Sequence, residues 1–137
     1  MNPLVSIIIP NYNHALFLKK RLDSVYNQTY PHFEVILLDD ASTDNSIEIL
    51  NLYKNHPKTA HLIVNTQNSG SPFKQWQKGV ELAKGELIWI AESDDYAAIN
   101  FLEQVTQPLL TNKEIGLAYC QSVVIDENNQ ALYINTK

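Results

Sequence analysis

The sequence predicts an α/β fold built on a mostly parallel sheet flanked by helices. Short apolar runs alternate with amphipathic helical segments through most of the chain. Such alternation is typical of parallel strands joined by right-handed helical crossovers. Two of the apolar runs end in an Asp-Asp pair, and near the C-terminus two further short runs flank a polar turn. We therefore expect one domain, residues 1–137, with an antiparallel hairpin or return strand after its parallel part.

Each expected strand is a short run of apolar, largely β-branched or aromatic residues with polar or proline residues at its ends. The first run stops at Pro10, because proline cannot donate a hydrogen bond to a sheet ladder. In the tail, Asp126-Glu127-Asn128-Asn129 reads as a hairpin turn. The expected strands are residues 4–9, 33–38, 62–64, 87–91, 116–125 and 131–134.

The first two helices are expected where apolar residues recur every three or four positions. The first begins after Asn13, a plausible N-cap, and ends near residue 27. The second follows Asp44 and Asn45, either of which can cap it, and Asn45 with Glu48 approximates a capping box. This helix ends before Pro57.

The third helix is expected to place Gly85 at its C′ position, where glycine tolerates a left-handed backbone. A fourth helix covers residues 99–110, and Pro108 should end or kink it. The apolar face expected to pack the third helix into the core consists of Phe73, Trp76, Val80 and Ala83.

Composition and charge narrow the function classes. The chain has 137 residues, of which 45% are hydrophobic and 18% charged, as expected for a folded domain. Its net charge of −5 argues against nucleic acid as the partner, because phosphate-backbone binding needs a basic surface. No apolar run could span a bilayer. The N-terminal residues do not resemble a signal peptide, and the single cysteine, Cys120, is expected to be a buried thiol. We therefore expect a cytoplasmic protein, or a full-length form peripheral to the inner membrane.

Carboxylates at two strand ends are the strongest functional signal. Residues 33–38 run into Asp39-Asp40, and residues 87–91 run into Glu92-Ser93-Asp94-Asp95. Ligands of open α/β sheets bind outside the carboxyl ends of the strands, and Mg²⁺ is often held by carboxylates together with substrate phosphates. Gathered like charges also repel unless a cation or ligand offsets them. The pattern predicts a metal–phosphate site, and a solvated acidic turn remains the alternative for residues 92–95.

Other candidate residues are expected at the same edge, each with a plainer alternative. Tyr12 follows the first strand and could stack on a flat ligand group or be a partly buried turn tyrosine. Asn68 and Gly70 follow the third strand, and Gly70 could allow close backbone approach to a ligand or be an ordinary loop glycine. Lys78 could reach phosphates or be a solvated helix lysine. Histidines expected in surface or loop positions are His14, His32, His56 and His61.

Taken together, these motifs resemble the N-terminal, nucleotide-sugar-binding part of a family 2 glycosyltransferase of the GT-A type. The resemblance covers residue 5 to about residue 119. It rests on the order and spacing of residues 5–13, Gln28-Thr29-Tyr30, residues 34–44, Asn68-x-Gly70, residues 79–86 and Ser93-Asp94-Asp95.

The resemblance implies a nucleotide-diphosphate-sugar donor, usually a UDP-sugar, a Mn²⁺ or Mg²⁺ ion, and inverting transfer to a saccharide or lipid-linked acceptor. It implies that Tyr12 stacks on the base and that Asp40 accepts a hydrogen bond from the base. Asp94 would meet the ribose or a metal-bound water, and Asp95 would bind the metal directly. The implied donor-binding residues are Pro10, Asn11, Tyr12, Asp40, Ser42, Lys78, Ser93 and Asp94, with Asp95 and Asp94 at the metal.

Two departures from the family pattern affect this expectation. Glu92 stands where the family's motif often begins with Asp, and its longer side chain need not place the carboxylate alike. Before Gly79 the family often carries Ala-Arg-Asn, whereas this chain reads Gln75-Trp76-Gln77-Lys78, so a basic diphosphate contact would fall to Lys78. A general base would lie downstream of the donor half, outside this chain. We therefore expect a donor-binding portion, from a truncated form or a split protein.

Two other functions remain open. A non-catalytic nucleotide-sugar-binding or interaction module could use the same fold. A nucleotidyltransferase would also combine an α/β sheet with metal carboxylates, but it usually carries a glycine-rich, basic phosphate loop after the first strand. Residues 10–14 contain no glycine, lysine or arginine, which disfavours that function. An uncovered sheet edge would also make a homodimer plausible.

Overall fold

The computed structural model describes residues 2–135. The chain forms two compact units, Met1–Asn100 and Phe101–Lys137. The first unit contains a four-stranded parallel sheet with helices, and the second contains a helix and a two-stranded antiparallel sheet. The predicted α/β class and its antiparallel hairpin are confirmed, and the hairpin forms a sheet of its own. That residues 1–137 act as one domain stays a prediction.

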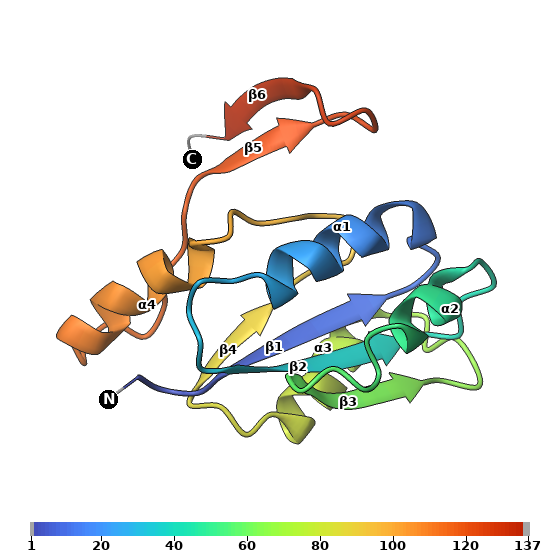
Figure 1. Ribbon diagram of the computed structural model, residues 1–137, viewed down its shortest axis with the longest axis horizontal. Helices are drawn as coiled ribbons and strands as arrows, with labels where there is room; N and C mark the ends of the chain where they lie inside the picture. The colour runs from blue at the N-terminus through green and yellow to red at the C-terminus, as the bar shows by residue number, and fades with distance from the viewer. Residues whose placement is uncertain (1, 136–137) are drawn as a thin grey trace. The chain divides into compact units, whose positions relative to one another are not determined.

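The parallel sheet has the strand order β3-β2-β1-β4 (Figure 1). Its strands are β1 (Val5–Asn11), β2 (Phe33–Asp39), β3 (Thr59–Val64) and β4 (Leu87–Ile90). From β1 the chain winds outward to β3, then crosses back to β4 on the other side of β1. Ligands of such sheets bind at the carboxyl ends of the strands where the winding direction reverses, which here is between β1 and β4.

Helices cover both faces of this sheet. With right-handed crossovers, α1 (Ala15–Tyr26) and α2 (Ser46–Asn51) lie on one face and α3 (Pro72–Leu82) lies on the other (Figure 1). The central strands are therefore buried on both sides, which explains their near-continuous apolar sequences. Ile7, Ile8, Ile36 and Leu38 are fully buried, and each such side chain stabilises the fold by about 1.5–3 kcal/mol.

Strand β1 continues through Pro10 to Asn11, so the prediction that Pro10 stops it was wrong. Pairing with β2 extends to Asn11, whereas pairing with β4 reaches only Ile8. At Pro10 the strand therefore has a neighbour on one side only. A proline can occupy such a position because no second ladder requires its missing N–H.

The buried face of α3 also differs from the prediction. Its buried residues are Gln75 and Gly79, whereas Phe73 is 66% exposed and Trp76 is half-buried. A Cβ atom on Gly79 would lie 2.4 Å from Ile8 Cγ2, so this glycine lets the helix pack closely against β1. The close approach turns the Gln75–Gly79 face toward the sheet and leaves the apolar stripe beside it.

Gly85 is not the C′ residue of α3, because the helix ends at Leu82 and Gly85 is not in the left-handed region. Its role is close packing against β1. A Cβ atom at this position would lie 2.6 Å from the Leu4 carbonyl oxygen and 2.6 Å from the Ser6 nitrogen. A side chain here would force β1 and the start of β4 apart.

The helix caps confirm one prediction and correct two. Asp44 accepts hydrogen bonds from the N–H of Ser46 (3.0 Å) and of Ala15 (2.9 Å), so one carboxylate serves the first residues of both α2 and α1. Asn45 makes no side-chain capping bond, so the capping box does not form. Asn13 is not the N-cap of α1 either, because His14 occupies that position.

The second unit contains α4 (Phe101–Thr111), β5 (Ser122–Ile125) and β6 (Ala131–Asn135). The helix runs past Pro108, so the proline does not end it. Asp126 Oδ1 accepts hydrogen bonds from the N–H groups of Asn128 and Gln130, which confirms its place in the hairpin turn. Cys120 is exposed and precedes β5, contrary to the buried thiol expected. Within residues 2–135, every helix is too short or too polar to cross a membrane.

Candidate functional site

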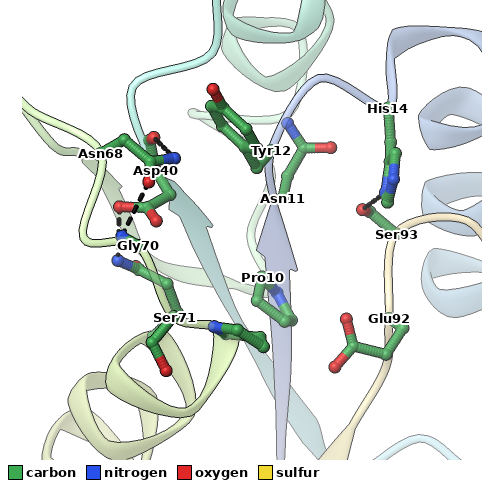
Figure 2. A pocket seen from close by; sticks show the side chains of 12 residues that line it. Pro10, Asn11, Tyr12, His14, Asp40, Asn68, Gly70, Ser71, Glu92 and Ser93 are labelled. Carbon is green, nitrogen blue, oxygen red and sulfur yellow. Dashed lines mark hydrogen bonds between the residues drawn. The ribbon is translucent and has the colours of Figure 1, made fainter.

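A cavity of about 380 Å³ opens at the carboxyl edge of the parallel sheet (Figure 2). The sequence predicted a site at this carboxyl edge, and the strand order adds that the winding of the sheet reverses there, between β1 and β4. Its walls come from the ends of β1 and β2, the loop before α3 and the turn after β4. The lining residues are Pro10, Asn11, Tyr12, His14, Asp40, Asn68, Gly70, Ser71, Pro72, Gln75, Glu92 and Ser93.

The loops after β1, β2 and β3 each contain one residue with a left-handed backbone. These residues are Asn13 (φ 55°), Ala41 (φ 63°) and Gly70 (φ 72°). For Ala41 this conformation costs roughly 1–2 kcal/mol, because its Cβ crowds the following carbonyl. Strain of this kind persists only where neighbouring contacts enforce it, and it is concentrated at functional sites. Next to Ala41, the hydrogen bonds of the preceding Asp-Asp pair are the contacts that hold the loop in place.

Asp39 holds the ends of β1 and β2 together. It is 0% exposed and accepts hydrogen bonds from Asn11 Nδ2 (2.9 Å), the Ser42 N–H (2.8 Å) and Ser42 Oγ (2.6 Å). Ser42 Oγ also accepts hydrogen bonds from Asn11 Nδ2 and from the Asn13 N–H. Ser42, a predicted donor-binding residue, therefore lies behind the cavity wall and fixes Asn11, which lines it.

Asp40 lines the cavity and is held by donors from the loop after β3 and from α3. Its carboxylate accepts hydrogen bonds from Asn65 Nδ2 (2.7 Å), from the Ser69 N–H (2.9 Å) and Oγ (2.7 Å), and from Gln75 Nε2 (2.9 Å). Burial alone would raise the pKa of Asp40, but the hydrogen bonds from Ser69 and Asn65, with the charge of Lys78, outweigh it and lower the pKa. The cavity thus contains a fixed, ionised acceptor.

Tyr12 and Lys78 take different places around Asp40. The Tyr12 side chain is 45% exposed at the rim of the cavity, where an aromatic face remains available. Lys78 Nζ donates to Asn65 Oδ1 at 2.6 Å, and Asn65 in turn donates to Asp40. Lys78 is therefore joined to the site through Asn65 and is not among the residues that line the cavity.

Glu92 lies on the side of the cavity opposite Asp40, with Pro10 between them (Figure 2). Trp76 Nε1 donates to Glu92 Oε1 at 2.7 Å. Burial raises the pKa of Glu92, and the nearby charges of Asp94 and Asp95 raise it further, although the indole hydrogen bond acts in the opposite direction. The charges of Asp94 and Asp95 are therefore close enough to Glu92 to disfavour its ionised form.

His14 was predicted only as a surface or loop residue, but it lines the cavity. Its Nδ1 atom lies 2.7 Å from Ser93 Oγ, which joins the loop after β1 to the turn after β4 (Figure 2). Ser93 is 1% exposed, so this contact fixes the first residue of the Ser93-Asp94-Asp95 motif. Nothing in the local sequence distinguishes His14 from the other histidines, because its role depends on a residue 79 positions away.

Asp94 and Asp95 follow Ser93, are exposed and do not line the cavity. Within residues 2–135 no group of three or more His, Cys, Asp or Glu side chains is arranged to hold a metal ion. The donor chemistry still fits Mg²⁺ or Mn²⁺, because such ions accept one or two protein carboxylates together with phosphate oxygens. The fit therefore depends on a phosphate-bearing ligand that completes the coordination.

Comparison with known proteins places this geometry in a family. The model of the family described as glycosyl transferase family 2 matches residues 6–135. A poly(ribitol-phosphate) beta-glucosyltransferase of Bacillus spizizenii is 44% identical over 94 residues, which cover 67% of this chain and 15% of that protein. An uncharacterised glycosyltransferase of Haemophilus influenzae is 36% identical over 138 residues, which cover 98% of this chain and 53% of that protein. The chain thus spans about half, or less, of these relatives.

Solved structures show the same fold. TarS 1-349 of S. aureus in complex with UDP-GlcNAc has a TM-score of 0.69 and 32% identity, covering 74% of this chain and 30% of that one. The mannosyltransferase PcManGT of Pyrobaculum calidifontis, in complex with GDP-Man and Mn²⁺, has a TM-score of 0.65 and 29% identity, covering 79% and 34%. These neighbours confirm the GT-A fold expected from the motifs. With the family model matching nearly its whole length, the chain belongs to glycosyltransferase family 2.

Proposed function

We propose that this chain is the donor-binding part of a glycosyltransferase that uses a nucleotide-diphosphate sugar, most simply a UDP-sugar. The observation that carries the proposal is the cavity at the carboxyl edge of the sheet, where the winding reverses between β1 and β4. The cavity has the fixed carboxylate of Asp40 on one side and the acidic turn, residues 92–95, on the other. The complexes of TarS with UDP-GlcNAc and of PcManGT with GDP-Man support this class of donor.

The base would bind beside Asp40 and Tyr12. The exposed ring of Tyr12 offers a face on which a planar base can stack. The ionised Asp40 can accept a hydrogen bond from a ring N–H of the base, because hydrogen bonds and the charge of Lys78 keep its pKa low. Asn11 and Pro10 would form the floor between this end and the acidic turn.

The diphosphate would lie toward the turn after β4. Asp95 would bind Mn²⁺ or Mg²⁺, and Asp94 would contact the ribose or a water on that ion. The cation, when bound, supplies Lewis-acid stabilisation of the leaving diphosphate. The contact between Ser93 and His14 fixes the chain directly before Asp94 and Asp95. Lys78 contributes positive charge through Asn65 rather than by direct contact.

The transfer itself would be a displacement at the anomeric carbon with inversion. The bond from that carbon to the diphosphate oxygen breaks, a bond to the acceptor hydroxyl oxygen forms, and a general base takes the hydroxyl proton. We place this base, and the site for a saccharide or lipid-linked acceptor, in a part of the protein beyond this chain. The donor half prepares the leaving group, and the acceptor half would supply the nucleophile.

Calorimetric titration of UDP in the presence of Mn²⁺ tests the donor site. Asp95→Asn should weaken metal-dependent UDP binding by at least about 10- to 100-fold, the range for residues that only orient a metal ligand. Glu86→Gln is the matched control, because it removes an exposed carboxylate before the start of β4 and should leave binding unchanged. Failure of the wild-type protein to bind UDP, GDP or dTDP with Mn²⁺ would contradict the proposal. Binding without hydrolysis or transfer to any acceptor supplied would favour a non-catalytic module.

A further inference from the structure

Arg21 is the only arginine of the chain, and its side chain is buried in the first unit. It lies on the buried face of α1 with Leu18, Leu22 and Val25, and only 4% of it is exposed. Its Nη1 atom is buried and has no hydrogen-bond partner within the described residues. Burial of an incompletely paired guanidinium is unfavourable. An apolar residue would suit this face better, so the reason for Arg21 lies in what the guanidinium contacts.

The guanidinium lies beside the acidic turn, which we define as residues 92–95. Arg21 Nε donates a hydrogen bond of 2.7 Å to the Glu92 carbonyl oxygen, and the guanidinium carbon lies 5.5 Å from the centre of the Trp89 ring. Burial lowers the pKa of Arg21 to about 10, and attraction to Asp95, Asp94 and Glu92 opposes that effect. Arg21 therefore stays cationic at neutral pH and is the buried counter-charge of this turn.

Helix α1 and the segment directly after it also hold the chain that follows the acidic turn. Ser24 Oγ accepts a hydrogen bond from the Ala97 N–H at 3.3 Å, and Gln28 Nε2 donates to the Ala98 carbonyl oxygen at 2.7 Å. With the Arg21 bond to Glu92, α1 and the segment directly after it contact the backbone on both sides of Asp94 and Asp95. These exposed carboxylates therefore belong to a short segment that is fixed at both ends.

We propose that Arg21 is a positioning residue for the acidic turn. Its guanidinium fixes the backbone at Glu92 and offsets the repulsion among the carboxylates, so that Asp94 and Asp95 are arranged before a cation and a diphosphate arrive. The inference rests on the proposed function, in which these two aspartates meet the metal and the donor. Arg21 itself touches neither, and its effect on binding is pre-organisation, which reduces the cost of ordering a site when the ligand binds.

A purely structural role makes a different prediction. Replacement of a buried charged residue by a well-packed apolar residue of similar size is often neutral or stabilising. If Arg21 only filled space, Arg21→Met would leave the acidic turn and its ligands unaffected. If Arg21 positions the turn, the same substitution should impair the turn specifically.

The binding test compares the wild-type chain with Arg21→Met, using UDP as the probe with and without Mn²⁺. We expect metal-dependent UDP binding to weaken by about 10- to 100-fold, as for other residues that orient metal ligands. UDP binding without metal should stay the same, because the base end of the cavity is built by other elements. Equal metal-dependent binding would overturn the proposal, because Arg21 would then have no effect on the site. Tighter binding would overturn it as well, because the guanidinium would then only repel the metal.

A second variant and a second measurement keep the test decisive. Arg21→Lys retains the charge but loses the planar donor group, and it should also lose metal-dependent binding. The second measurement is a double-mutant cycle in denaturant unfolding, in which Arg21→Met is made in the wild type and in the double variant Asp94→Asn/Asp95→Asn. The factor by which Arg21→Met raises the unfolding equilibrium constant should be about three- to tenfold larger in the wild type than in the double variant. Equal factors in both backgrounds would overturn the counter-charge role. The exposed Lys54→Met is the control and should show no such coupling.

The two proposals fail in distinguishable ways. If the wild-type chain binds no UDP, the proposed function fails, while the unfolding cycle still tests whether Arg21 is coupled to the acidic turn. If UDP binds with Mn²⁺ but Arg21→Met and Arg21→Lys bind it as tightly as the wild type, the donor site stands and the positioning role is wrong.

Discussion

Strands β2 and β4 are each followed by an Asp-Asp pair, yet the two pairs are in opposite physical states. Asp39 is the last residue of β2, whereas Asp94 and Asp95 lie in the turn after β4, which ends at Ile90. Asp39 and Asp40 are 0% and 5% exposed and accept several hydrogen bonds from the protein. Asp94 and Asp95 are exposed. The difference follows from sheet position, because β2 lies between β1 and β3, whereas β4 has β1 on one side and is the edge strand. Loops on both sides of β2 supply donors, and β4 has only one such neighbour.

This comparison shows that an acidic strand end becomes one of two kinds of site. A carboxylate saturated by donors is held ionised in one orientation and recognises a ligand by hydrogen-bond geometry. A carboxylate left in solvent beside others of its kind gains most from a cation. The hydrogen-bonded pair and the exposed pair therefore differ in the expected effect of substitution on stability and in the expected dependence of stability on pH.

The largest effect is expected at Asp39. In Asp39→Ala the partly buried N–H of Ser42 loses its acceptor, and the buried Asn11 amide loses one of its two acceptors. The free energy of unfolding should therefore fall by about 3 kcal/mol. Urea unfolding measures this change. Asp94→Ala is the matched control at the exposed pair and should change stability by no more than about 0.5 kcal/mol. Equal losses at the two positions would remove the distinction between the pairs.

Asp40→Asn is expected to have a smaller effect, with a defined pH dependence. The substitution keeps the shape but turns an amide N–H₂ toward the donors of Asn65 or Gln75, which should cost about 1–2 kcal/mol at neutral pH. The folded-state pKa of Asp40 lies below its ordinary value of 3.8, so its ionised form stabilises the fold above that pH. This contribution is lost as pH falls through the folded-state pKa.

Unfolding of Asp40→Asn measured across the acidic range checks that sign. The difference from wild type should begin to shrink as the pH falls below the ordinary pKa of 3.8 and should be lost below the lower folded-state pKa, where both proteins carry an uncharged side chain at this position. A difference that grows on acidification would mean that Asp40 is not held as an anion. Loss of UDP binding at neutral pH, measured on the same variant, would connect the fixed acceptor to base recognition.

Much of this arrangement could be predicted from local sequence, because it depends on burial and chain order. The apolar runs that lead into Asp40 and Asp95 gave the strands, and parallel connections bring such strand ends to one edge. Arg21 could also have been found, since it occupies a position in the apolar stripe formed by Leu18, Leu22 and Val25. A charged residue within an apolar stripe breaks the helical pattern, and such a break indicates that the residue has a specific partner.

The remaining features depend on contacts between distant residues. Gln75 faces the core because Gly79 brings α3 against Ile8 and because Asp40 receives the Gln75 amide, and neither contact has a local signature. For the same reason the apolar appearance of Trp76 was misleading. Its indole is half-buried and serves as a hydrogen-bond donor to Glu92.

Glu92→Gln should have the smallest effect and the opposite sign to Asp40→Asn. Burial raises the pKa of Glu92 above its ordinary value of 4.5, with repulsion from Asp94 and Asp95 added, so the charged form is disfavoured in the fold. Its stabilising contribution is present below the ordinary pKa and is lost as pH rises through the folded-state pKa. Glutamine keeps an oxygen that can accept the hydrogen bond from Trp76 without the charge.

At neutral pH, Glu92→Gln should therefore raise the free energy of unfolding by about 0.5 kcal/mol, after allowance for solvent screening at a partly exposed site. The gain should vanish on acidification, where glutamate is protonated and equally uncharged. Urea unfolding at neutral and acidic pH, with Glu86→Gln as the exposed control, measures both quantities. If Glu92→Gln were destabilising at neutral pH, the carboxylate would have to be stabilised as an anion by Trp76 and its surroundings. The two strand ends would then share one electrostatic state, and the comparison between them would fail at the acidic turn.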